Sequence, residues 1–139
     1  MAVIVTDTGF GPDDWTGGFT ALADLPANGP VPGVDVPSDA DPATLQDRLA
    51  EIEAIRIDFP SFADGRGFTI ARRLRLMGFA GRLRARGHVI ADQYAMARRA
   101  GFDEAEISDA LAARQPEAQW LRRADWQAHD YQSRLRRLA

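Results

Sequence analysis

The chain has 139 residues, enough for one domain with a sizeable core, and its 17 basic residues are all arginines. It contains no cysteine, which excludes disulfides, a catalytic thiolate, cysteine-held iron–sulfur clusters and thiolate zinc sites. Because there is no lysine, Schiff-base catalysis is excluded and an anion must be bound by arginine or by backbone N–H groups. The two histidines, His88 and His129, are too few for a multi-histidine metal site.

Charge is distributed unevenly along the chain. Residues 1–47 carry eight aspartates and no basic residue (−8), whereas residues 48–139 carry 17 arginines against seven aspartates and five glutamates (+5), which gives the net −3. The arginines alternate with acids and no nucleic-acid-binding motif is present, so we expect no nucleic-acid partner. No apolar run approaches the roughly 20 residues of a membrane span and no secretion signal is recognisable, so we expect a cytoplasmic protein without membrane contact.

Residues 1–33 are predicted to form a loosely structured arm packed on the domain. This segment holds six of the twelve glycines and four of the eight prolines. A short strand is expected over residues 3–5, and the aromatic side chains of Trp15 and Phe19 are expected to fold back onto the domain.

Residues 34–139 are predicted to form a single α/β domain. Strand patterns cover residues 33–37, 54–59, 81–86 and 102–107, and helical patterns cover residues 68–77 and 90–100. A further helix is expected to begin at Asp41 as the N-cap, with Pro42 at its first position and Leu45, Leu49 and Ile52 on its buried face. Repeated strand–helix units indicate a small parallel sheet of about three to four strands with flanking helices, either half-barrel-like or open.

Residues 116–138 are predicted to form one long amphipathic helix. The residues at helical spacing are Trp120, Ala124, Ala128, Tyr131, Leu135 and Leu138. Such an apolar stripe packs on its own domain or, alternatively, joins two copies of the chain into a homo-oligomer.

Any chemistry is expected within residues 58–93. In a parallel sheet, ligands bind beyond the carboxyl ends of the strands, where loops lead into helices. The residues predicted to bind a ligand there are Asp58, Asp64, Gly65, Arg66, Gly67, Arg84, Arg86, Gly87, His88, Asp92 and Gln93.

The run Asp64-Gly65-Arg66-Gly67 at a helix start has two interpretations. It suits a phosphate, sulfate or sulfite, because free N–H groups and a guanidinium converge there. Alternatively it is a tight turn, with Asp64–Arg66 or Asp58–Arg86 pairs holding the structure together. His88 likewise is either a general acid or base or a hydrogen-bonded structural residue.

The runs FPSFADGRGFTIARRLR and GRLRARGHVIADQYAMARRAGFDEAEI resemble the bacterial domain-of-unknown-function family 934. The signature of that family falls on Phe59, Pro60, Phe62, Asp64, Gly65, Arg66, Gly67, Ala71, Leu74, Arg75, Arg84, Gly87, Asp92, Gln93, Gly101, Phe102 and Asp103. The resemblance implies a role in assimilatory sulfate and sulfite reduction as an oxidoreductase-like accessory protein.

Two functions follow as expectations. The first is an accessory protein of sulfite reduction that acts through a protein partner, such as sulfite reductase or its electron donor, with the acidic arm assisting encounter. The alternative is a small enzyme or sensor that binds a phosphate- or sulfate-bearing ligand at the run of residues 64–67. Whether the protein is an enzyme stays open, and the sequence contains no evident cofactor or metal site.

Overall fold

The structure is a computed structural model, and it describes residues 2–127. Within them the chain forms a mixed α/β fold with one seven-stranded sheet in the order β2-β1-β7-β6-β5-β4-β3. The strands are β1 (Ala2–Thr6), β2 (Gly9–Gly11), β3 (Thr20–Ala21), β4 (Val31–Val36), β5 (Ile52–Phe59), β6 (Arg82–Gly87) and β7 (Glu104–Ser108). The five strands β3 to β7 run parallel, whereas β1 is antiparallel to both β7 and β2.

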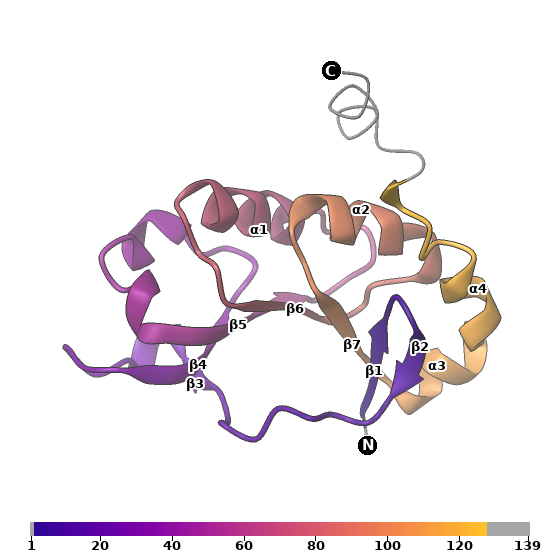
Figure 1. Ribbon diagram of the computed structural model, residues 1–139, viewed down its shortest axis with the longest axis horizontal. Helices are drawn as coiled ribbons and strands as arrows, with labels where there is room; N and C mark the ends of the chain where they lie inside the picture. The colour runs from indigo at the N-terminus through magenta and orange to yellow at the C-terminus, as the bar shows by residue number, and fades with distance from the viewer. Residues whose placement is uncertain (1, 128–139) are drawn as a thin grey trace.

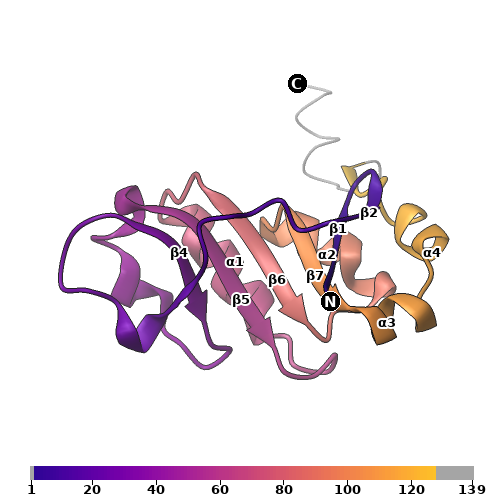
Figure 2. The ribbon, with the colours of Figure 1, turned by 90° about the horizontal axis from the view of Figure 1, so that it is seen from below.

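The α/β class is confirmed, but the prediction of a three- to four-stranded sheet is too small. β1 matches the short strand expected over residues 3–5, whereas β2 and β3 come from the part of residues 1–33 that was expected to be loosely structured. β1 pairs with β7, placing Ile4 opposite Glu106. The part between β2 and β3 has no regular structure and crosses the sheet (Figure 2).

Helices α1 (Arg66–Leu76) and α2 (Tyr94–Ala100) cover one face of the sheet (Figure 1). The segment between β2 and β3 lies on the opposite face (Figures 1 and 2). Two short helices, α3 (Asp109–Arg114) and α4 (Glu117–Leu121), follow β7 and lie near the β1–β2 hairpin. Among the described residues, the sheet therefore has one face covered by α1 and α2 and a second face crossed by the irregular segment between β2 and β3.

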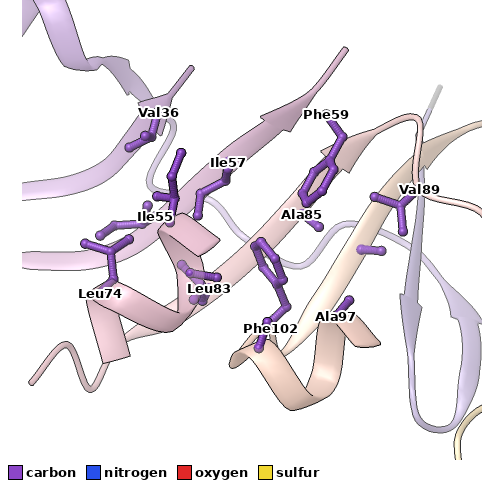
Figure 3. Packing of buried hydrophobic residues seen from close by; sticks show 14 of the residues in the cluster. Val36, Ile55, Ile57, Phe59, Leu74, Leu83, Ala85, Val89, Ala97 and Phe102 are labelled. Atoms are coloured by element: carbon purple, nitrogen blue, oxygen red, sulfur yellow. The ribbon is translucent and has the colours of Figure 1, made fainter. Parts of the chain in front are cut away.

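The hydrophobic core fills the space between the sheet and the helices. Ile57 and Phe59 of β5 and Leu83 of β6 point toward Leu74 of α1 and Phe102 after α2 (Figure 3). All five are buried. Because side chains alternate along a strand, the residues between these apolar ones face the other side of the sheet.

The helix expected to begin at Asp41 is replaced by two 3₁₀ turns, Pro42–Leu45 and Leu49–Glu51. Its start signal is confirmed, since the Asp41 carboxylate accepts a hydrogen bond from the N–H of Ala43 at 3.0 Å. Arg48 draws this segment toward residues 26–29 by donating to the carbonyls of Pro26 (2.8 Å) and Gly29 (3.3 Å). A helix that continued from Pro42 would lose this geometry.

The long helix predicted over residues 116–138 is wrong in its described part, because α4 ends at Leu121. Trp120 is buried in edge contact with Phe10 and Tyr94. Trp126 donates from Nε1 to Oδ2 of Asp7 at 3.3 Å. Each tryptophan is thus bound separately to the domain, and the chain turns between them; residues 128–138 lie outside the described residues. In residues 2–127 no helix is both long and apolar enough to span a membrane.

Candidate functional site

The face of the sheet opposite the helices carries two rows of charged side chains, in which acidic residues flank arginines. Asp35, Arg56, Arg84 and Glu104 occupy paired positions on four neighbouring strands, and Asp58, Arg86 and Glu106 form the next row toward the carboxyl ends. Opposite charges on adjacent strands stabilise their pairing. This explains why the strand sequence RLRARG lies beside EAEIS.

Arg84 lies at the centre of this network, with its side chain only 1% exposed. Its guanidinium donates to Glu104 at 2.9 Å, to Glu106 at 2.7 Å and in a bidentate manner to Asp13 at 2.9 and 3.0 Å. Burial by itself lowers the pKa of Arg84, but the hydrogen bonds to Asp13 and Glu106 and the charge of Glu104 raise it above its usual value. The predicted ligand residue Arg84 is therefore fully engaged within the protein.

Acidic side chains of the N-terminal segment neutralise arginines of the rest of the chain. Among the described residues, five of the eight aspartates in residues 1–47 form ion pairs of this kind: Asp7–Arg98, Asp13–Arg84, Asp14–Arg82, Asp35–Arg56 and Asp41–Arg73. The uneven charge of the sequence is thus largely satisfied inside one chain. Phe19 adds to this closure, because its ring centroid lies 4.1 Å from the guanidinium carbon of Arg56.

A hollow of about 390 Å³ lies at the carboxyl ends of β5, β6 and β7. We call it the edge hollow; its lining residues include Asp58, Arg86, Gly87, His88, Glu106 and Ser108. The topology therefore brings together four of the predicted ligand residues: Asp58, Arg86, Gly87 and His88.

Arg86 lines the edge hollow, and its charge is neutralised less by carboxylates than the charges of the nearby Arg56 and Arg84. Its Nε lies 3.3 Å from Glu106, a carboxylate that also contacts Arg56 at 3.1 Å and Arg84 at 2.7 Å. The side chain of Arg86 is 49% exposed. Since Arg56 and Arg84 each have further acidic partners and Arg86 has none among the described residues, its guanidinium retains most capacity for an added anion.

Asp58 and His88 also retain free polar atoms. Among residues 2–127, neither side chain makes a hydrogen bond or ion pair, and both line the edge hollow. The position of His88 is fixed through its backbone N–H, which donates to the carbonyl of Phe59 at 2.9 Å. Gly87 permits this close approach, since a Cβ there would lie 2.7 Å from the same carbonyl oxygen and φ is +112°.

The run of residues 64–67 lies elsewhere, at the N-terminus of α1. Asp64 accepts hydrogen bonds from the Arg66 guanidinium at 2.7, 3.0 and 3.2 Å and from the Arg66 N–H at 3.1 Å. These hydrogen bonds, led by the one from the Arg66 side chain, lower the pKa of Asp64 to about 2. A carboxylate of the chain itself therefore occupies the position predicted for an external anion. Gly67 permits close helix packing, because a Cβ there would lie 2.5 Å from the Phe59 ring.

Asp92 and Gln93 are also separated from the edge hollow. Asp92 pairs with Arg123 at 2.8 Å. Gln93 accepts from the N–H of Ile90 at 3.1 Å and donates to the carbonyl of Phe62 at 2.7 Å, which connects the loop after β5 to α2. These contacts give both residues structural roles in the present geometry.

Sequence reasoning missed Glu106 and Ser108 as lining residues. A signal for Glu106 exists in the sequence, since EAEIS alternates acids with small or apolar residues in the strand that pairs with RLRARG. No local signal marks Ala2, which reaches the hollow through the long-range pairing of β1 with β7. In the described part of the chain, no group of three or more histidine, aspartate or glutamate side chains is arranged to hold a metal ion.

Fold and site together define a two-layer α/β domain with a polar hollow at the carboxyl edge of its parallel strands. The chain belongs to the family described as "Bacterial protein of unknown function (DUF934)", whose profile matches residues 33–138. No curated protein and no solved structure gives a significant match. The match begins after β3, so β1, β2 and β3 lie outside the matched region.

Proposed function

We propose that the protein binds a small oxyanion-bearing molecule in the edge hollow and serves as an accessory of sulfite reduction. The observation that carries the binding proposal is the convergence of half-exposed Arg86 with two unpartnered polar side chains, Asp58 and His88, in one hollow. This hollow lies where parallel α/β sheets bind their ligands. The link to sulfite reduction comes from the family resemblance, which makes sulfite and sulfate the first anions to test.

We propose the edge hollow as the binding site, in place of residues 64–67, for an electrostatic reason. Asp64 already accepts hydrogen bonds from Nε and Nη2 of Arg66 and from its backbone N–H, so a second anion at these donors would have to compete with a carboxylate of the chain. An anion that binds Arg86 displaces less, since the one acidic partner of Arg86, Glu106, is shared among three arginines. His88 is available to hydrogen-bond other atoms of the ligand, and Asp58 is available to accept a hydrogen bond from a donor group of the ligand or to exchange a proton with it.

The experiment is calorimetric titration of the protein with sulfite, sulfate, phosphate and acetate. At least one anion should bind, and Arg86→Gln should weaken it about 10- to 100-fold, the range for loss of a charge-assisted hydrogen bond. The matched control is Arg72→Gln, which removes an exposed arginine of α1 that has no described ion pair. Equal binding by Arg86→Gln and the native protein would contradict the proposal.

A second candidate is direct action on a protein partner, sulfite reductase or its electron donor. It is supported by Phe62, whose side chain is 61% exposed on the loop after β5. Exposed aromatic side chains often anchor interfaces. Substitution Phe62→Ser should then reduce capture of purified sulfite reductase at moderate salt, whereas Leu76→Ser, a change at an 81% exposed site on α1, should not. Equal capture by the Phe62→Ser variant would count against this candidate.

A further inference from the structure

Asp58 and Arg86 are opposite charges that are neighbours without being partners. They occupy paired positions on β5 and β6, so their side chains leave the same face of the sheet side by side. Arg86 nevertheless contacts Glu106, and Asp58 forms no ion pair among the described residues. A ligand with a negative and a positive group could satisfy both side chains at once.

A second hollow adjoins the first at these same two residues. It has a volume of about 270 Å³, and both Asp58 and Arg86 line it as well as the edge hollow. Its other lining residues are Ala21, Leu22, Ala23, Asp35, Val36, Pro37 and Arg56. Asp35 and Arg56 pair with each other at 2.6 Å, which leaves mainly apolar side chains to contact a ligand. We call this second space the apolar hollow.

The charges favour a ligand that is neutral overall. An anion bound to Arg86 alone would lie beside the unpaired carboxylate of Asp58 and would be repelled by it. An ammonium group on the same molecule removes that repulsion and gives Asp58 a charge-assisted hydrogen bond. Arg86 would hold the anionic group as a planar fork, a geometry that suits a carboxylate.

We infer that the ligand is a small zwitterion with an apolar substituent, of the kind represented by an α-amino acid. Its anionic group contacts Arg86, its ammonium group contacts Asp58, and its carbon chain enters the apolar hollow. This assignment rests on the proposed function, since it needs anion binding at Arg86, and it adds the second charged group and the apolar body.

The test compares matched ligands by calorimetry. Glycine, alanine, norvaline and norleucine are titrated beside acetate, propionate, pentanoate and hexanoate, the acids of the same lengths without the amine. We expect each amino acid to bind about tenfold or more tightly than its acid. Affinity should rise by about two- to fourfold for each added methylene that the apolar hollow covers.

Two variants test which part of the site provides each gain in affinity, the carboxylate of Asp58 or the apolar hollow. Asp58→Asn should bring each amino acid down to the affinity of its acid. Ala23→Trp, a change at an exposed position in the apolar hollow, should abolish the chain-length dependence and keep glycine binding. Ala80→Trp, at an exposed position just before β6 at the opposite edge of the sheet, is the matched control and should change neither property.

The outcomes separate this inference from the function on which it rests. If acetate or an inorganic anion binds through Arg86 but the amine and the chain add nothing, the zwitterion inference is wrong and anion binding stands. If amino acids bind equally well to Asp58→Asn, Asp58 is not the ammonium partner and the inference is also wrong. If no anion and no amino acid binds, the proposed function itself fails.

Discussion

Replacing Arg84 by methionine should destabilise the protein strongly, because the Arg84 guanidinium is buried among carboxylates of the chain itself. Its side chain is 1% exposed and contacts three carboxylates, those of Asp13, Glu104 and Glu106. Removing one member of a buried ionic network costs about 3–5 kcal/mol, since it leaves the partners buried and uncompensated. Glu104 and Glu106 keep other arginines, so we expect the lower end, about 3 kcal/mol.

The assay is urea unfolding at neutral pH, followed by tryptophan fluorescence and circular dichroism. The midpoint should fall while the slope stays constant, which shows that stability has changed and not the extent of unfolding. Arg72→Met is the control, because Arg72 is exposed and has no described ion pair; it should change stability by no more than about 0.5 kcal/mol. Adding Asp13→Asn to Arg84→Met should restore part of the loss, because it removes the carboxylate whose ion pair was to Arg84.

A loss below about 1 kcal/mol for Arg84→Met would refute this reasoning, because it lies well under the cost of an unpaired buried carboxylate. If the same variant also lost anion binding, the prediction of Arg84 as a ligand residue would be supported. The expected result is the reverse: lower stability, with the anion affinity of the folded fraction unchanged.

Three further changes test the local structure. Gly67→Ala should lower the free energy of unfolding by about 1–3 kcal/mol, because its Cβ would lie 2.5 Å from the Phe59 ring. The control is Gly65→Ala, whose Cβ would lie 3.9 Å from its nearest neighbour and which should be close to neutral. Equal effects of the two substitutions would exclude the packing explanation. Arg75→Lys should lower the free energy of unfolding by about 2 kcal/mol, since one ammonium cannot replace the guanidinium donors that reach three backbone carbonyls. An unchanged melting temperature would show that these contacts are dispensable. Asp13→Asn should make the free energy of unfolding depend less on pH at acid pH. The hydrogen bond from its arginine partner lowers the folded-state pKa of Asp13 below 3.8, so the native carboxylate stabilises the fold above that pH. This contribution disappears as the pH falls through the folded-state pKa. Parallel stability–pH curves for the native protein and Asp13→Asn would contradict that assignment.

The central part of the fold could be predicted because its signals are local. Apolar alternation in residues 54–59 and the helical stripe of Ile70 and Leu74 each determine their own element and its buried face. Strands β1 and β2 could not be placed in this way. β1 gains its position by pairing with β7, about a hundred residues away in the chain, and no local pattern encodes that partner.

The candidate site was predicted in part for a related reason. The rule that ligands bind at the carboxyl edge selected Asp58, Arg86, Gly87 and His88, which do meet in one hollow. Arg84, also predicted as a ligand residue, does not line this hollow: it faces the same side of β6 as Arg86 but lies one pleat further inside the sheet. Whether an arginine that far inside is free depends on what covers it, and here the cover is Asp13, 71 positions away.

At residues 64–67 the structure shows the Asp64–Arg66 pair, which was one of the two interpretations of this run. Arg66 and Asp64 are two positions apart, close enough to pair with each other in a turn before any ligand arrives. The same four-residue run contains both the guanidinium that could bind an anion and a carboxylate that pairs with it. Composition and motif alone do not decide between these two interpretations, whereas the hydrogen bonds of the folded turn do.

The most direct test of the edge hollow as the binding site is a two-dimensional ¹H–¹⁵N NMR titration of the protein with sulfite, repeated with glycine. The proposed site predicts saturable shifts for the amides of residues 58–59, 86–88 and 106–108, with residues 64–67 unaffected, and it predicts that Arg86→Gln abolishes them. Shifts confined to residues 64–67, or no saturable shifts with either molecule, would contradict it.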